Sequence, residues 1–289
     1  MSEQLQTGKI TYTDSGALYN KPGLELVVVE SERCRAVLAL QGAQLLEFQA
    51  RDRAPMLWLS PRAYFQEGVP IRGGIPLCMP WFGPGRESGL PKHGVARTRP
   101  WQLQSARECE NGSVELVCTY NHTGDEMFTP FRCTVTMTLA DTIALALELE
   151  NTAGASAEFS WAWHTYFAVD DVRATRVLGL EKTDYLDNTR GLERGRQEGA
   201  VTFPGEVDRV YEDAGPAQRI DSASPVTTRS ENCRSVITWN PGPQLAASMD
   251  DIGEHFGQFV CVEHGNAFAN SWRLASGELA HARLELENG

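Results

Sequence analysis

The chain has 289 residues, a formal net charge of −12 and 42% hydrophobic residues. This length allows one large domain with a sizeable core, and the composition is ordinary for a soluble globular protein. The excess of acidic residues argues against nucleic acids and anionic membrane surfaces as partners.

The predicted elements are mostly strands, beginning with three in the first 50 residues. Residues 1–20 are polar, and we expect a loosely held arm with a short strand there. Strands are expected at residues 24–30, 34–40 and 43–50, followed by a short apolar segment at 56–59. Pro61 suits the first position of a helical turn, which we expect over residues 61–66.

The middle of the chain gives the clearest β pattern. Residues 101–107 and 113–120 flank Asn111-Gly112, a dipeptide typical of a β-hairpin. Apolar and polar residues then alternate strictly over 131–139 and again over 143–149. The alternation predicts a long antiparallel hairpin with one buried face.

The C-terminal half predicts further strands at residues 158–169, 176–180, 233–239, 244–248, 258–263 and 282–286. The polar residues 181–218 show little periodicity, so we expect a long excursion between strands there, and a short helix at 250–256. Sustained helical periodicity, internal repeats and linkers are absent from the sequence. We therefore expect a single, mainly β domain over residues 1–289, a large antiparallel β-sandwich.

The cysteines and the first residues bear on localisation. The seven cysteines, at positions 34, 78, 109, 118, 133, 233 and 261, form no CxxC pair, and several lie in apolar runs. Free cysteines in such runs behave as small hydrophobic residues. The segment MSEQLQTGKI does not have the pattern of a signal peptide, and no apolar run approaches the roughly 20 residues of a membrane helix. We expect a cytoplasmic protein without disulfides or a zinc site.

The segment at residues 71–97, IRGGIPLCMPWFGPGRESGLPKHGVAR, concentrates basic side chains among glycines and prolines. Proline excludes a regular helix, and both residue types weaken a central strand. The segment is too rich in apolar residues for a disordered loop. We expect an ordered loop that presents Arg72, Lys92, His93 and Arg97 at a pocket. The alternative is a set of ordinary surface arginines and a structural histidine.

Three further residues could carry chemistry. His164 lies in WAWHTYF, where aromatic neighbours can desolvate the imidazole and tune its pKa. Glu263 follows the apolar strand FVCV, where a buried carboxylate is costly unless it is paired or functional. Asp208 lies in EVDRVY. The alternatives are a core histidine bonded to a backbone carbonyl, a glutamate facing water and a solvated aspartate.

Other chemistries fit the sequence less well. GPGRESG lacks the ending of a phosphate-binding P-loop, and no GxSxG motif is present. The six histidines form no HxH or HxxxH pair. A metal site made from His93, His164, His255 and Glu263 is compatible with a β fold, although the spacing does not require one.

The segments RGGIPLCMPWFGP, LPKHGVAR, HTYF, VDRVY and VCVEHGN occur in the order seen in the aldose 1-epimerase family. The chain most closely resembles the glucose-6-phosphate 1-epimerase (D-hexose-6-phosphate mutarotase) branch, over nearly its whole length from about residue 24. The resemblance implies the galactose mutarotase-like supersandwich, a cofactor-free isomerase and a small sugar phosphate as substrate.

The resemblance also implies roles for individual residues. His164 resembles the general acid and Glu263 the general base, while Asp208 resembles the residue that holds sugar hydroxyls. Arg72 and Arg97 resemble the arginines that bind substrate and phosphate. We expect His93 to be a second site histidine. Lys92 departs from the pattern, because some relatives have a substrate-contacting glutamine there, and an amine could instead reinforce phosphate binding or point to water.

The reaction fits these residue types. Exchange of α and β anomers needs a base at the C1 hydroxyl, an acid at the ring oxygen, and rotation of the open aldehyde, without metal or nucleotide. Planar guanidinium groups suit a phosphate dianion better than sugar hydroxyls, which favours a sugar phosphate over a free sugar.

Other functions remain open at this point. One is a mutarotase of free aldoses, and another is a metal-dependent isomerase of the cupin kind. A third is a non-catalytic carbohydrate-binding sandwich that uses Trp81, Phe82 and Trp163. We expect a monomer.

Overall fold

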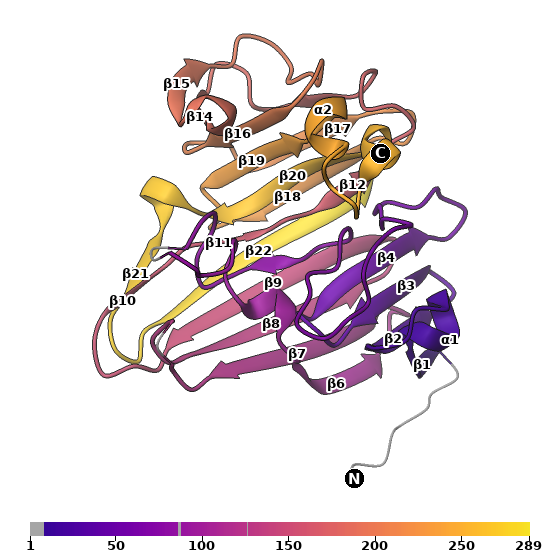
Figure 1. Ribbon diagram of the computed structural model, residues 1–289. Helices are drawn as coiled ribbons and strands as arrows, with labels where there is room; N and C mark the ends of the chain where they lie inside the picture. The colour runs from indigo at the N-terminus through magenta and orange to yellow at the C-terminus, as the bar shows by residue number, and fades with distance from the viewer. Residues whose placement is uncertain (1–8, 86–87, 126) are drawn as a thin grey trace.

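A computed structural model describes residues 9–85, 88–125 and 127–289 of the protein (Figure 1). Its paired strands run antiparallel and build two eight-stranded sheets, one four-stranded sheet and one two-stranded sheet. The prediction of a mainly β, antiparallel fold is confirmed. Within the described ranges, no helix is long and apolar enough to cross a membrane.

The first large sheet has the strand order β13-β17-β18-β22-β9-β8-β7-β6. Its strands are β6 (Gln102–Glu108), β7 (Val114–His122), β8 (Phe131–Leu139), β9 (Thr142–Asn151), β13 (Arg176–Leu178), β17 (Ala217–Asp221), β18 (Val226–Glu231) and β22 (Leu279–Asn288). The two predicted hairpins are its β6–β7 and β8–β9 pairs.

The second large sheet carries the cavity described below. Its order is β15-β14-β16-β19-β20-β11-β5, and β12 also pairs with β20. Its strands are β5 (Leu77–Cys78), β11 (Trp161–Trp163), β12 (Tyr166–Ala168), β14 (Asp184–Asp187), β15 (Glu193–Arg196), β16 (Val207–Tyr211), β19 (Ser235–Asn240) and β20 (Phe259–Asn266).

The remaining elements are short and lie around the large sheets (Figure 1). The four-stranded sheet contains β1 (Ile10–Asp14), β2 (Glu25–Glu30), β3 (Cys34–Ala39) and β4 (Gln44–Ala50), and β10 (Ala157–Phe159) pairs with β21 (Trp272–Leu274). The helices are α1 (Ser15–Tyr19) and α2 (Gly242–Ala246), with 3-10 turns η1 (Ala96–Thr98), η2 (Asn188–Arg190), η3 (Gly253–Gln258) and η4 (Phe268–Asn270).

One hydrophobic core joins the inner faces of the two large sheets. The alternating apolar residues of β8 and β9 are buried and meet Trp161 and Trp163 of β11 in a single cluster. Val260 and Val262 of β20 belong to the same cluster. Because successive residues of a strand point to opposite faces, Cys261 and Glu263 lie on the other side of the sheet. The core therefore fixes which residues of β20 face the cavity.

Two predicted elements are absent. Residues 61–66 do not form a helix. The backbone N–H of Ala63 donates to the oxygen of Ser60 at 3.0 Å, which closes a single turn around Pro61, and the oxygens of Pro61 and Ala63 accept hydrogen bonds from Nζ of Lys21 at 2.8 and 3.0 Å. Residues 244–248 do not form a strand, because α2 begins at Gly242 and has a proline in its first turn. A proline at that position suits a helix and removes a donor that a strand would need.

Two other segments divide differently from the prediction. Residues 158–169 contain most of β10 and all of β11 and β12. The chain turns between β11 and β12, where the backbone N–H of Thr165 donates to the oxygen of Trp163 at 3.0 Å. Residues 181–218 contain β14, β15, β16 and the start of β17. All four residues of β15, at the edge of the sheet, are at least partly exposed, which explains the missing periodicity.

Part of the predicted arm lies within the described residues. Residues of β1 pair with β2, and α1 follows directly. Residues 1–8 of the predicted arm lie outside the described residues. The single-domain organisation stays a prediction.

We predict that Gly74→Ala destabilises the fold by more than about 3 kcal/mol. Gly74 has φ +62°, and an added Cβ would lie 2.2 Å from the oxygen of Leu45 and 2.8 Å from Cα of Leu46. Gly68 is the matched control, because its φ is +76° but nothing lies within 4 Å of an added Cβ. Gly68→Ala should cost only the conformational term of about 1–2 kcal/mol. Urea unfolding measures both, and equal losses would show that the close approach to β4 is unimportant.

Candidate active site

A cavity of about 400 Å³ opens on the outer face of the second large sheet. Its lining includes all of the residues predicted from the sequence to bind substrate or act in catalysis: Arg72, Lys92, His93, Arg97, His164, Asp208 and Glu263. The structure therefore brings together residues that are up to 191 positions apart in the chain (263 − 72). Their individual roles remain predictions.

Strand register places the acidic residues of the cavity. Asp208 of β16 pairs with Trp239 of β19, and Ile237 of β19 pairs with Glu263 of β20. Paired residues of an antiparallel ladder share a face, and so do residues two positions apart. Asp208, Trp239 and Glu263 therefore project from one face of three neighbouring strands.

His164 and Glu263 contact each other at the bottom of the cavity. Nε2 of His164 lies 3.2 Å from Oε1 of Glu263. Glu263 is 1% exposed, so it does not face water, and the partner of the imidazole is a carboxylate rather than a backbone carbonyl. Within the described residues, Nδ1 of His164 and Oε2 of Glu263 are buried without a hydrogen-bond partner. A bound substrate could satisfy such atoms.

The protein environment moves the two pKa values in opposite directions. Burial, and then the positive charges of Arg97 and Arg72, lower the pKa of His164 well below its usual value. Burial, and then the negative charge of Asp208, raise the pKa of Glu263 well above its usual value. The two shifts favour a neutral imidazole and a protonated carboxyl, so they bias the pair toward one shared proton, with one group able to act as acid and the other as base.

His93 is a neutral hydrogen-bond donor toward the cavity. Its backbone has φ 66°, and its Nδ1 accepts a hydrogen bond of 3.1 Å from the backbone N–H of Gly83. Burial, and then Arg97, lower the pKa of His93 well below its usual value. Because Nδ1 accepts, the single proton of the neutral ring is assigned to Nε2.

The two arginines are held in different ways. Arg72 donates from Nε to Asp251 Oδ2 at 2.9 Å and from Nη1 to the Tyr166 hydroxyl at 2.8 Å. Arg97 donates from Nη2 to the backbone oxygen of Lys92 at 2.8 Å, and its buried Nε has no partner within the described residues. Both guanidinium groups therefore keep donors for an anion.

Asp208 is paired rather than freely solvated. Its Oδ2 accepts a hydrogen bond of 2.7 Å from the side-chain amide of Asn188, and burial raises its pKa. Sequence reasoning missed Asn188 and Asp251, which also line the cavity. Both lie where the sequence shows no strong periodicity, so only the tertiary fold identifies them.

Comparison with known proteins places the chain in a family. The family model for aldose 1-epimerase matches residues 25–287. The chain belongs to the aldose 1-epimerase family. A relative from Salmonella typhimurium, provisionally named as a glucose-6-phosphate 1-epimerase, is 35% identical over 247 residues, which cover 83% of this chain and 82% of the relative.

Solved structures agree with this family assignment. A crystal structure of a provisionally named mutarotase from Salmonella typhimurium has a TM-score of 0.90 at 30% identity, covering 99% of this chain and 95% of that chain. A galactose mutarotase-like protein from Clostridium acetobutylicum has a TM-score of 0.73 at 12% identity and covers 98% of this chain and 100% of that chain, which shows the fold alone. The predictions of a galactose mutarotase-like fold and of an epimerase, an isomerase, are confirmed.

One group of side chains in this epimerase could hold a metal ion. Donor atoms of His164, Cys261 and Glu263 lie within 4.8 Å of one another, the sole group of three or more found among the described residues. It differs from the set considered from the sequence, since Nε2 of His255 instead lies 3.5 Å from Glu254. The positive charges that lower the pKa of His164 also act against a cation at this place.

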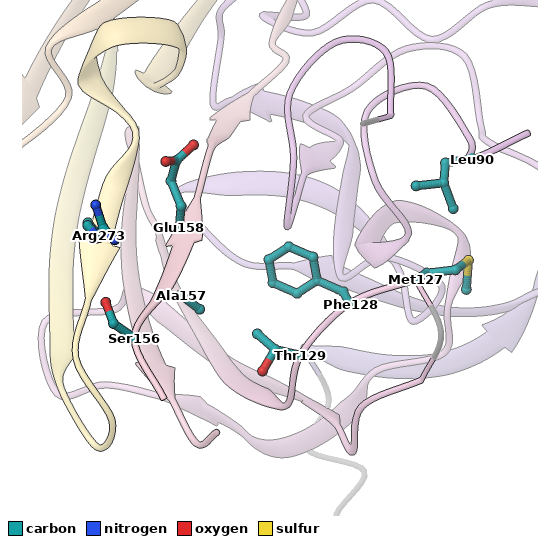
Figure 2. A pocket seen from close by; sticks show the side chains of 8 residues that line it. All are labelled: Leu90, Met127, Phe128, Thr129, Ser156, Ala157, Glu158 and Arg273. Atoms are coloured by element: carbon teal, nitrogen blue, oxygen red, sulfur yellow. The ribbon is translucent and has the colours of Figure 1, made fainter. Parts of the chain in front are cut away.

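A second cavity, of about 430 Å³, lies beside the β10–β21 pair (Figure 2). None of the predicted site residues lines this cavity. Its lining consists of Leu90, Met127, Phe128, Thr129, Ser156, Ala157, Glu158 and Arg273. Glu158 and Arg273 pair in strand register, and Figure 2 shows them on neighbouring strands opposite Leu90 and Met127. Arg273 therefore lies in a different cavity from the catalytic candidates.

We predict that the rate of anomer exchange stays nearly constant across neutral pH. The pKa of His164 is lowered well below its usual value and that of Glu263 is raised well above its usual value, so the imidazole of the free protein does not titrate near pH 6.5. Activity should fall in acid when the pair takes up a further proton and no longer contains a base, and in alkali when it loses its proton and no longer contains an acid. The charged groups facing the pair are Asp208, Arg72, Arg97 and Lys92. A steep change of kcat/KM, which reports the free protein, centred near pH 6.5 would contradict the lowered pKa of His164.

Proposed function

We propose that the protein is a glucose-6-phosphate 1-epimerase, which interconverts the α and β anomers of a hexose 6-phosphate. The observation that carries the proposal is the buried contact between His164 and Glu263 in a cavity that also holds two guanidinium groups. The names of the relatives support the substrate class. The reaction requires no cofactor.

The chemistry follows from an acid and a base on one sugar ring. Glu263 removes the proton from the C1 hydroxyl while His164 gives a proton to the ring oxygen, and the bond between C1 and the ring oxygen breaks. The products are an aldehyde at C1 and a hydroxyl at C5. Rotation about C1–C2 presents the other face of the aldehyde, and the same steps in reverse close the ring. No proton is gained or lost overall.

Substrate binding favours the proton distribution that this mechanism needs. In the free site the two shifts favour a proton on Glu263 over a proton on His164, because the pKa of His164 is lowered and that of Glu263 is raised. A phosphate group beside Arg72 and Arg97 would offset their positive charges, which are among the causes that lower the pKa of His164. The proton can then pass across the 3.2 Å contact to Nε2 of His164, leaving Glu263 as the base.

The other residues position the substrate. Arg72 and Arg97 bind the phosphate through planar donors, and Lys92 adds a third positive charge to the same cavity. Asp208, held by Asn188, accepts hydrogen bonds from sugar hydroxyls, and Nε2 of His93 donates one. Positioning matters as much as pKa, because the reacting groups carry little net charge.

Two-dimensional exchange NMR of glucose 6-phosphate anomers tests the proposal. The protein at neutral pH with EDTA present should accelerate exchange of the phosphate more than exchange of free glucose. Acceleration of free glucose alone would favour an aldose mutarotase. Loss of activity with EDTA would favour the metal-dependent isomerase.

A non-catalytic sugar-binding sandwich is less well supported by the geometry. Trp163 is 2% exposed and Trp81 is 6% exposed, so neither offers a free face for stacking on a sugar. Phe82 is the one of the three that lines the cavity. Binding of glucose 6-phosphate without faster exchange would still establish this function.

We further propose that the protein acts as a cytoplasmic monomer. Free thiols support the compartment, because all seven cysteines are unbridged and six of them are buried. The complete set of catalytic candidates within one chain supports the monomer. Sedimentation in the ultracentrifuge tests the oligomeric state.

A further inference from the structure

The guanidinium of Arg72 is fixed from several sides. Asp251 Oδ2 accepts from Nε at 2.9 Å, the Tyr166 hydroxyl accepts from Nη1 at 2.8 Å, and the group lies 6.0 Å from the ring centroid of Trp239. The side chains of Arg72 and Asp251 are only 21% and 17% exposed. Within the described residues, Nη2 has no protein partner. The guanidinium of Arg72 is therefore held rigidly, and its Nη2 edge remains available to a ligand.

The backbone holds Asp251 beside Arg72. Asp251 lies between α2 and η3, far from Arg72 in sequence. The hydroxyl of Ser60 donates to the backbone oxygen of Asp251 at 2.6 Å, and the backbone N–H of Ser60 donates to the oxygen of Arg72 at 3.0 Å. Substitution of the Asp251 side chain leaves these backbone contacts in place. The role of the carboxylate can therefore be tested by substitution without removing the hydrogen bonds that hold the backbone at Asp251.

Tyr166 links this arginine to the catalytic candidates. Its ring stacks on the imidazole of His164 with centroids 4.9 Å apart and planes inclined by 13°. The same residue accepts from Arg72 through its hydroxyl. The position of the Arg72 guanidinium relative to His164 is thus set by Tyr166 on one side and by Asp251 on the other.

We propose that Asp251 is a positioning residue that orients the Arg72 guanidinium for the phosphate group of the substrate. The inference rests on the proposed function and names a residue that the sequence did not reveal. A long arginine side chain has many rotamers, and an anion gains from it only when its donors are already aimed. The carboxylate does not touch the substrate and acts through Arg72.

Two effects of the Asp251 charge oppose each other. The carboxylate aims the guanidinium, which strengthens phosphate binding, but it also offsets part of the positive charge. If orientation dominates, removal of the side chain weakens phosphate binding. If charge dominates, removal tightens it. Asparagine separates the effects, because its amide oxygen can still accept from Nε of Arg72 without carrying a charge.

The test compares Asp251→Ala, Asp251→Asn and the neighbouring control Asp250→Ala, since Asp250 is exposed and does not line the cavity. Exchange NMR gives kcat and KM for glucose 6-phosphate and kcat/KM for free glucose, and calorimetry gives the Kd of glucose 6-phosphate without relying on turnover. Asp251→Ala should raise KM and Kd about tenfold with kcat nearly unchanged. Asp251→Asn should fall between the alanine variant and wild type, while Asp250→Ala should match wild type.

Each outcome has a defined meaning. Free glucose should be turned over equally by all variants, because it has no phosphate. Unchanged or lower Kd in Asp251→Ala would overturn the positioning role. An equal loss on both sugars would show a general structural effect and also overturn it. Absence of exchange in the wild-type protein would instead refute the proposed function, and the Kd comparison would still decide what Asp251 does.

Discussion

Replacement of Glu263 by glutamine should lower kcat for anomer exchange by about 10²–10⁴-fold. Glutamine has nearly the same shape and can still hydrogen-bond to Nε2 of His164, but it cannot take the proton from the C1 hydroxyl. Exchange NMR at saturating glucose 6-phosphate measures kcat directly. KM should change little, because Arg72 and Arg97 remain in place.

The same substitution should not destabilise the fold at neutral pH. The pKa of Glu263 is raised in the folded protein, so ionisation of this carboxyl above its usual pKa disfavours folding. A neutral amide removes that cost, and a urea unfolding curve should show equal or greater stability at pH 7. Lost activity combined with retained stability would separate a catalytic role from a structural one.

The matched controls use a nearby carboxylate and the partner imidazole. Glu206 lies close enough for Asp208 to raise its pKa, yet it does not line the cavity. Glu206→Gln should therefore keep nearly full activity. His164→Ala should be about as slow as Glu263→Gln, and the double variant little slower, because the two groups act as a unit. A Glu263→Gln protein within tenfold of wild type would remove the proposed base.

The strands that were predicted well are those with one buried face. Apolar and polar residues alternate over residues 131–149, and this pattern predicted the β8–β9 hairpin with its buried and exposed faces. The pattern exists because every second side chain of these strands is buried. The edge strand β15 was missed because none of its side chains is fully buried, and its neighbour β14 was missed because it has only four residues, of which two are buried. Alternation of apolar and polar residues arises from burial of one face, so a strand that buries few side chains does not show it.

Some residues of the candidate site could be identified from the sequence and others could not. Glu263 was identified because an acidic residue follows a run of apolar ones, and burial at 1% exposure is what that pattern suggested. His164 and the basic residues of the loop at 71–97 had unusual neighbours in sequence. Asp251 and Asn188 had no unusual neighbours in sequence. They reach the cavity only because the packing of distant segments brings them there. Such residues can be identified only from the three-dimensional structure, because tertiary packing decides which side chains they contact.

Replacement of Arg97 by alanine should lower kcat/KM for glucose 6-phosphate by about tenfold to a hundredfold, the size expected for loss of hydrogen bonds to a charged group. Asp251 already pairs with Arg72, whereas Arg97 donates to a backbone carbonyl, that of Lys92. Arg97 therefore has more unpaired charge to offer a phosphate dianion. Exchange NMR at low substrate concentration measures kcat/KM.

Free glucose and two further variants distinguish phosphate binding from a general effect. Arg97→Lys keeps the charge but loses the planar fork, so it should recover only part of the activity. Arg99→Ala removes a neighbouring positive charge that does not line the cavity and should have little effect. Free glucose should react at the wild-type rate with Arg97→Ala, unless the backbone at Lys92 moves when its hydrogen bond from Arg97 is lost. An equal loss for both sugars would therefore assign Arg97 to holding the loop rather than to binding phosphate.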